Sequence, residues 1–303
     1  MKILKQSSSV LALSEHNGFP FDYKNSMFLQ EYSGRLCYKS EESITKTSHV
    51  NFLNNIKEMK HLSVLEHSWK KVLYKIMINK ISTYYSYVNK ACYPHLNFYI
   101  GYENDYLYVV VTGNERAYDD WLEKTHFDDG LQIMNVNLNV TKLAKKTNRY
   151  DLLSMTSHFV TNRAIANELV RHRMASYSQE STRYCNYNSM RFDNSCSFIE
   201  PINGITNEWE ETMKTCEKNY LSLIDNGTKP EVARGLLPMD LKTEIIMTAN
   251  LKSWKHVFDQ RYHNQTGKSH PQFTELLELL INDIKKRDNT EWLVDYLLNK
   301  GEK

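Results

Sequence analysis

Arginine and hydroxyl side chains are concentrated in one fourteen-residue stretch, RHRMASYSQESTRY, which runs from Arg171 to Tyr184. Its strongest hydrogen-bond donors are Arg171, His172, Arg173 and Arg183. Arginine stays charged at physiological pH, and its planar fork of N–H groups matches the paired oxygens of phosphates and carboxylates. So many donors with almost no apolar residue are poorly suited to a protein core. We therefore expect an anion site here, with a nucleotide as the first candidate ligand.

The composition is that of an ordinary globular protein, with 41% hydrophobic and 24% charged residues among 303. A chain of this length can bury a sizeable core in one domain or two. The net charge is only +2, whereas a general nucleic-acid binder usually carries a larger positive excess. No apolar run approaches the roughly 20 residues that span a bilayer, and the N-terminus lacks a signal-peptide pattern. We expect neither a nucleic-acid nor a membrane partner.

Cysteine and histidine spacing argues against a metal site. The five cysteines are widely spread and form no CxxC pair: Cys37, Cys92, Cys185, Cys196 and Cys216. This pattern disfavours a disulfide framework and structural zinc, and it favours a reducing, cytoplasmic location. The eleven histidines show no HExxH-like spacing, and no glycine-rich phosphate loop is present. A nucleotide would have to be held by side chains and helix ends.

Apolar periodicity predicts a mixture of helices and strands. Helices are predicted over residues 24–38, 46–60, 115–125, 209–225, 251–261 and, as two helices, 271–298. Strands are predicted over residues 69–77, 106–111, 154–161 and 243–248. Pro230 suits the first turn of a further short helix, and Asn250 suits the cap of the helix predicted over residues 251–261. The expected fold class is α+β (mixed α/β), with helices packed around a central, mostly antiparallel sheet.

One more predicted helix leads directly into the arginine motif. Thr161 or Asn162 can cap this helix, because both side chains accept hydrogen bonds from backbone N–H groups. Its buried side would carry Ile165, Leu169 and Val170. The helix would end at the arginines, and the polar residues that follow would continue as a loop.

Several residues near the motif also have ordinary structural interpretations. Glu168 shares a helical face with Arg171 and could form a solvated ion pair, but the polar run that continues to Arg183 is not needed for a salt bridge. Ser181 lacks both a GxSxG turn and an identifiable base, so a phosphate or loop hydrogen bond is favoured over a nucleophile. Cys185 is expected to be a small buried hydrophobe.

The motif resembles the signature of the flavin-dependent thymidylate synthases, in which Arg-His-Arg is followed by a serine, here Ser181, and then by Arg-Tyr, here Arg183 and Tyr184. Three further stretches agree in the same order: GRLCYKS at 34–40, HLSVLEH at 61–67 and EVARGLLPMDLKTEIIMTANLKSWKHVFDQR at 231–261. The resemblance spans about residues 30–290 apart from the middle. It implies one domain over residues 1–303, with an insertion atypical of the family at about residues 75–155.

The resemblance implies an enzyme that converts dUMP to dTMP, as a homotetramer with active sites between subunits. It implies FAD as cofactor, NADPH as reductant and 5,10-methylenetetrahydrofolate as one-carbon donor. By position, the flavin side of the site would comprise His61, Ser63, Arg171, His172, Arg173, Asn250, Lys252 and His256. The dUMP side would comprise Glu168, Arg171, Gln179, Glu180, Ser181, Thr182, Arg183, Arg234 and Arg261. The family gives the catalytic role to Arg261, which stabilises the anionic uracil.

The chain departs from the family pattern at two positions. Glu168 stands where many members have Gln, and Lys252 stands where Arg is common, which replaces a bidentate fork with a point charge. Two alternative functions remain open: a non-catalytic nucleotide- or RNA-binding module, and a flavoenzyme of the family with a different methyl acceptor. The near-neutral net charge and the match at residues 250–261 speak against the first alternative.

Overall fold

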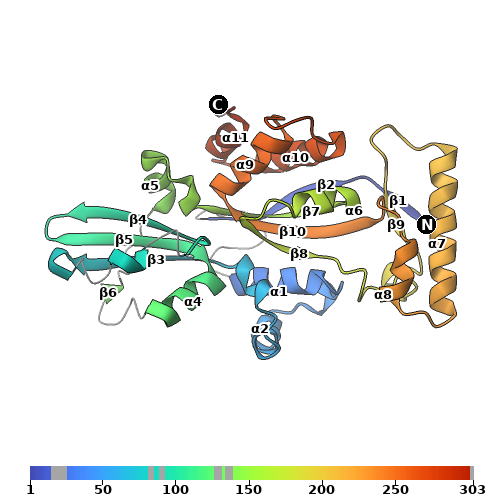
Figure 1. Ribbon diagram of the computed structural model, residues 1–303, viewed down its shortest axis with the longest axis horizontal. Helices are drawn as coiled ribbons and strands as arrows, with labels where there is room; N and C mark the ends of the chain where they lie inside the picture. Colours follow the sequence, from blue (N-terminus) through green and yellow to red (C-terminus); the bar gives the residue numbers. More distant parts are fainter. Residues whose placement is uncertain (15–25, 81–84, 89–92, 126–131, 134–138, 301–303) are drawn as a thin grey trace.

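The computed structural model describes residues 1–14, 26–80, 85–88, 93–125, 132–133 and 139–300. A four-stranded antiparallel sheet lies at its centre, in the order β2-β7-β10-β8 (Figure 1). Its strands are β2 (Ser7–Leu13), β7 (Ser154–Asn162), β8 (Ala175–Gln179) and β10 (Lys242–Asn250). Helices cover this sheet, so the predicted α+β class with a central antiparallel sheet is confirmed.

Helices pack on both faces of the central sheet (Figure 1). On the face that we call the α9 face lie α6 (Arg163–Leu169), α9 (Leu251–Arg261), α10 (Pro271–Ile284) and α11 (Glu291–Leu298). The opposite α1 face carries α1 (Ser26–Leu36). Ile245 and Met247 belong to the core of the α9 face, and Ile246 belongs to the core of the α1 face. The middle of β10 is buried on both sides, and this explains why three apolar residues follow one another there instead of alternating with polar ones.

A parallel pair of strands and two helices form one end of the molecule (Figure 1). These elements are β1 (Lys2–Leu4), β9 (Ser197–Ile199), α7 (Asn207–Asp225) and α8 (Pro230–Ala233). Helix α7 stops where the sequence predicts, because Gly227 adopts a positive φ of 84°, which costs glycine little. Pro230 occupies the first turn of α8, as predicted.

A second antiparallel sheet extends from the other end of the molecule, in the order β4-β5-β3-β6 (Figure 1). It is formed by β3 (Trp69–Met77), β4 (Leu96–Glu103), β5 (Tyr106–Asn114) and β6 (Gln132–Ile133). One face packs against α4 (Glu115–Thr125), where the Trp121 ring contacts Tyr74 and Phe98. Most of this sheet falls within the segment that we propose as an insertion. Parts of that segment, including Cys92, lie outside the described residues.

The remaining elements are short or peripheral. They are the helices α2 (Ser48–Glu58) and α5 (Val140–Thr147), and the 3-10 helices η2 (Glu41–Ser43), η3 (Leu62–His67), η4 (Ile78–Lys80), η5 (Tyr85–Val88), η6 (Tyr150–Leu152), η7 (Met190–Phe192) and η8 (Arg234–Leu236). Every predicted helix and strand is present, and strand β3 has the predicted bounds. The sequence does not predict β2, β4 or α5.

Two predictions around the arginine motif are wrong. Val170 was expected on the buried side of α6, but that helix ends at Leu169 and Val170 is 38% exposed. The polar residues after the arginines were expected to form a loop, but the first of them, Ala175–Gln179, form strand β8 at the edge of the central sheet. Pairing with β10 places Ser176 and Ser178 against the α1 face, where both are buried. Tertiary context overrides the loop preference of these serines.

Candidate functional site

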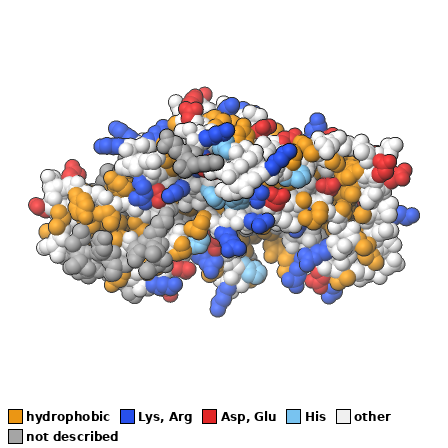
Figure 2. Space-filling model, turned by 45° about the horizontal axis from the view of Figure 1, so that its top comes forward, with side chains coloured by type: hydrophobic (Ala, Val, Ile, Leu, Met, Phe, Trp, Pro, Cys, Tyr) orange, Lys and Arg blue, Asp and Glu red, His pale blue; other side chains and the backbone are white. Residues whose placement is uncertain are grey.

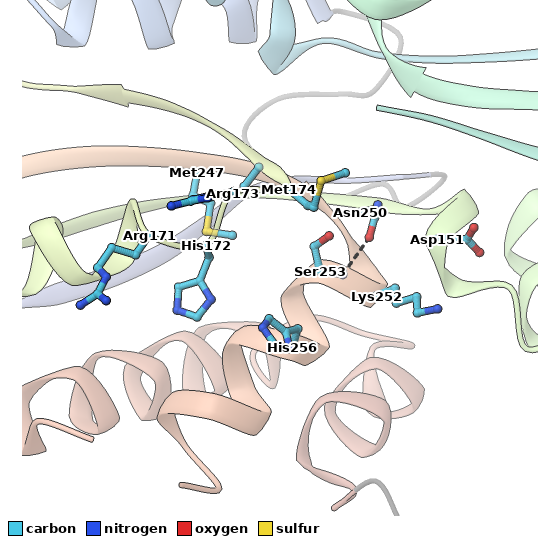
Figure 3. Close-up of a pocket in the computed structure, with 11 residues that line it drawn as sticks. Asp151, Arg171, His172, Arg173, Met174, Met247, Asn250, Lys252, Ser253 and His256 are labelled. Carbon is cyan, nitrogen blue, oxygen red and sulfur yellow. Dashed lines mark hydrogen bonds between the residues drawn. The ribbon is translucent and has the colours of Figure 1, made fainter. Parts of the chain in front are cut away.

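A pocket of about 550 Å³ lies where β8, β10 and α9 meet η6 (Figure 3). It is lined by Asp151, Arg171, His172, Arg173, Met174, Ala175, Met247, Asn250, Lys252, Ser253 and His256. Six of the eight residues predicted for the flavin side are in this lining. Met247 and Ala175 give the pocket an apolar wall, and the basic side chains surround it. The pocket therefore joins two segments that are about 75 residues apart in the sequence.

The N-terminus of α9 adds hydrogen-bond donors to this pocket. The side-chain oxygen of Asn250 accepts a hydrogen bond from the N–H of Ser253 at 2.8 Å, so Asn250 caps the helix as predicted. The first N–H groups of a helix and its dipole favour an anion. Figure 2 shows Lys, Arg and His side chains gathered over the middle of the face turned toward the viewer. The charge distribution suits an anionic ligand.

Helix η6 forms one wall of the pocket and is tied to the second sheet. The guanidinium of Arg149 donates from Nε and Nη2 to the two carboxylate oxygens of Asp151, at 2.8 and 2.9 Å. Its Nη2 also donates to the carbonyl of Phe98 on β4 at 2.8 Å. The carbonyl of Leu153 accepts from the N–H of Leu251, the first residue of α9, at 2.9 Å. Sequence reasoning missed this link, because an Arg-x-Asp pair alone does not indicate a site.

We expect Arg149→Met to lower the free energy of unfolding by about 3 kcal/mol, because it removes the bidentate partner of a buried carboxylate. Asp151 is 6% exposed, so water replaces the lost contacts poorly. Urea unfolding followed by circular dichroism measures the change. Lys146→Met is the matched control, since it removes an exposed charge from neighbouring α5 and should change stability by no more than about 0.5 kcal/mol. Equal stabilities of the two variants would contradict the prediction.

Arg261 lies beside the pocket, at the last residue of α9, and contacts His172. Its Nη1 is 2.9 Å from the Glu168 carboxylate, and its Nε donates a long 3.5 Å hydrogen bond to Nε2 of His172. Glu168 thus pairs with Arg261 rather than with Arg171. Burial lowers the pKa of His172 to about 4, and the nearby charges of Arg261, His256 and Arg171 act in the same direction. His172 is therefore neutral at pH 7, and the proton of its ring lies on Nδ1.

Other predicted dUMP-side residues lie at the opposite end of β8 from the pocket. The Nε of Arg183 is 3.1 Å from the carboxylate of Glu231, and Nη1 of Arg234 donates to the hydroxyl of Thr182 at 3.4 Å. The Ser181 hydroxyl accepts from the N–H of Arg183 at 3.2 Å, which agrees with the predicted loop hydrogen bond. One copy of the chain does not bring this cluster to the pocket.

Glu180 and Gln179 are held by protein partners. The Glu180 side chain is buried, and its two oxygens contact the ammonium of Lys242 at 2.8 Å and the hydroxyl of Tyr187 at 2.9 Å. Lys242 also pairs with Glu244, so Glu180 belongs to an internal charge network on the α1 face. Gln179 donates to the hydroxyl of Thr243 at 3.2 Å. The predicted ligand contact of Glu180 is therefore not supported within a single chain.

His61 and Ser63 are exposed and belong to the η3 region, which lies on the α1 face. The contacts of His67, at the end of η3, show on which side of the central sheet this region lies. The ring nitrogens of His67 are 2.8 Å from the hydroxyl of Thr248 and 3.0 Å from the hydroxyl of Ser178. Both hydroxyl residues alternate with residues of the α9 face, so η3 and the pocket lie on opposite sides of the central sheet. A single chain does not unite His61 and Ser63 with the six pocket residues.

The residues that the structure describes contain neither a cluster of metal ligands nor a membrane-spanning helix. Within these residues, no group of three or more His, Cys, Asp or Glu side chains could hold a metal ion. None of the helices in the described ranges is both long enough and apolar enough to span a bilayer.

The chain is similar to known proteins over part of its length. A family model described as "Thymidylate synthase complementing protein" matches residues 139–286. A flavin-dependent thymidylate synthase from Synechocystis sp. is 30% identical over 154 residues, which cover 44% of this chain and 71% of the relative. Proteins of the same name from Geobacter sulfurreducens and Pyrococcus furiosus are 38% and 29% identical over 104 and 138 residues, or 33% and 45% of this chain. The chain spans about half the length of these two relatives (44% and 55%). This chain belongs to the flavin-dependent thymidylate synthase family.

Proposed function

We propose that the chain is an FAD-dependent thymidylate synthase that converts dUMP to dTMP, with 5,10-methylenetetrahydrofolate as one-carbon donor and NADPH as reductant. Family membership supports the reaction class, and the names of the relatives supply the flavin and the product. The observation that carries the proposal is the convergence of residues 171–173 and 250–256 on one pocket. A surface ion-pair patch would not require this convergence.

The donors of the pocket fit a flavin dinucleotide. Arg171, Arg173 and Lys252 would hold its diphosphate together with the N-terminus of α9, because guanidinium, ammonium and helix N–H groups all stabilise phosphate. Met247 and Ala175 offer apolar surface for a flat ring. When bound, FAD supplies hydride transfer, whereas the chain supplies binding, orientation and exclusion of water.

Arg261 has the chemistry needed to activate uracil. C5 of uracil is a weak nucleophile until negative charge builds up on N3 and the neighbouring carbonyl. A fixed guanidinium stabilises that charge, and it remains protonated throughout the reaction. The neutral ring of His172 adjoins this guanidinium and adds no second positive charge. This role of Arg261 requires no catalytic cysteine.

We also propose that the active sites form between copies in a cytoplasmic homotetramer. The proposal is supported by the separation of the Arg183–Arg234 cluster from the pocket and by His61 lying on the opposite face of the sheet. The free state of the described cysteines, including Cys37 and Cys216, fits a reducing compartment.

Mixing two inactive variants tests this shared site. Arg173→Ala removes a pocket residue and Arg183→Ala removes a residue of the distant cluster. If each active site draws on two subunits, co-refolded hybrids contain some intact sites and regain part of the activity. Hybrids as inactive as either parent, with light scattering showing mixed tetramers, would contradict the shared site.

Flavin content and tritium release test the proposed reaction. We expect the purified protein to be yellow or to take up added FAD. We also expect it to release tritium from C5-labelled dUMP only when both NADPH and methylenetetrahydrofolate are present. A colourless protein that takes up no FAD would contradict the proposal. A flavoprotein that releases no tritium would favour the alternative, a family flavoenzyme with a different methyl acceptor.

Cys185→Ser should keep wild-type turnover within a few-fold. Cys185 is 2% exposed, and burial raises the pKa of its thiol to about 12, with the charge of Glu180 adding to the shift. A thiol with such a pKa supplies almost no thiolate at pH 7, so it cannot serve as a nucleophile. Steady-state assays of the variant test this. A folded, flavin-binding variant without turnover would show that the thiol takes part in the reaction.

A further inference from the structure

We propose that Glu168 is a positioning residue for Arg261, which orients the guanidinium and does not contact the substrate. This inference rests on the proposed function of Arg261. It differs from the expectation that Glu168 binds dUMP directly, and it explains how a carboxylate is tolerated beside an anionic ligand.

The guanidinium of Arg261 is held from several directions by different elements. Glu168 on α6 pairs with Nη1 at 2.9 Å, and His172 accepts from Nε at 3.5 Å. The ring of Phe273 on α10 lies 5.3 Å from the guanidinium carbon, within the range of a cation–π contact. The backbone is fixed as well, because the hydroxyl of Thr274 donates to the carbonyl of Arg261 at 3.0 Å. These contacts restrain a side chain that is otherwise flexible.

The contacts leave one part of the guanidinium available. Glu168 pairs with Nη1 and His172 accepts from Nε, while Nη2 forms no hydrogen bond with any residue in the described ranges. The Arg261 side chain is 22% exposed, so Nη2 can reach a ligand while the other groups remain held. Arginine has five N–H donors in a rigid plane, and fixing one edge therefore aims the other.

Charge alone does not define this role of Glu168. Glu and Gln side chains are of similar length, and each presents a side-chain oxygen that can accept a hydrogen bond. The shared property is an acceptor oxygen beside Nη1 of Arg261. Replacement by Gln should therefore preserve the orientation of the guanidinium, whereas replacement by Leu, which has similar size and no acceptor, should release it.

Kinetics of Glu168→Gln and Glu168→Leu test the proposal. We expect the Leu variant to lose about 10- to 100-fold in kcat, with little change in KM for dUMP, because a misplaced catalytic group slows the chemical step. The Gln variant should stay within a few-fold of wild type. Both should bind FAD normally, since Glu168 is not in the pocket lining. Asn167→Leu, on the exposed side of the same helix, is the matched control and should behave as wild type.

Crystal structures of the same variants give a readout that needs no activity. The guanidinium should keep its place over Phe273 in the wild type and in Glu168→Gln, and leave it in Glu168→Leu. A wild-type protein without turnover would refute the proposed function, and the structures would still test the positioning. An unmoved Arg261 in the Leu variant would overturn the inference. A higher KM for dUMP with unchanged kcat in Glu168→Leu would also overturn the inference, because it would mean that Glu168 contacts dUMP itself.

Discussion

Replacing Arg261 with alanine is expected to lower kcat for dTMP formation by about 100- to 1,000-fold, the usual loss when one preorganised oxyanion donor is removed. In the proposed reaction, the guanidinium stabilises negative charge that develops on uracil. Alanine leaves a space that water can enter, but water must reorient during the reaction, whereas the held guanidinium is already in place. Flavin binding should persist, because Arg261 is outside the pocket lining.

Single-turnover kinetics measures the loss of rate in Arg261→Ala, and flavin titration measures whether the variant still binds flavin. Arg261→Lys keeps the charge but not the planar fork, so it should recover only part of the lost rate. Lys268→Ala is the matched control, because it removes an exposed positive charge seven residues further along the chain. Turnover at the wild-type rate in Arg261→Ala would contradict the catalytic role. A loss of flavin would instead indicate that Arg261 supports the pocket.

Local signals in the sequence predict the elements that carry the pocket. Asn162 and Asn250 each precede an apolar helical pattern, and each side chain accepts a hydrogen bond from the N–H three residues later. The cap defines where α9 begins, which in turn places Lys252 and His256 on its first turns. Capping depends on a few neighbouring residues, so it can be recognised without knowledge of the tertiary structure.

Strand β8 and Glu180, the residue that follows it, show where local signals fail. Ser176, Ser178 and Glu180 are polar, which favours a loop, yet all three are buried on the α1 face. Their polar groups are satisfied by distant residues: Ser176 by Glu66, Ser178 by His67 and Glu180 by Lys242. A buried polar group is tolerated when it is hydrogen-bonded. Because these partners lie 62 to 111 residues away, the sequence around the strand gives no indication of them.

Motif matching also could not predict which site residues lie on which face of the sheet. Matching by position lists Glu180 beside Gln179 and Ser181, but consecutive strand residues point to opposite faces. Glu180 therefore enters the internal charge network while Gln179 faces Thr243. The link from Arg149 to Phe98 was equally hidden, because it joins the pocket wall to a sheet that the sequence predicts only in part.

We expect acid to destabilise the protein through His67, by roughly 3 kcal/mol between pH 7.5 and pH 4.5. His67 is 1% exposed, and burial lowers the pKa of its imidazole from 6.5 to about 3. Below about pH 6.5 the imidazole of His67 is protonated in the unfolded chain, whereas in the folded chain it stays neutral down to about pH 3. The unfolded state thus binds more protons in this window, and the free energy of unfolding falls as the pH falls.

Urea unfolding of the wild type and of His67→Gln across this pH range isolates the contribution. The glutamine amide can still reach Thr248 and Ser178, but it does not titrate, so the variant should show a shallower dependence of stability on pH. His172 also has a lowered pKa, but it is present in both proteins and cancels in the difference. An overall loss of stability in the variant shifts its curve without changing the slope. Parallel curves would mean that His67 does not resist protonation, and the buried contact between η3 and the central sheet would then not be the acid-sensitive point of the fold.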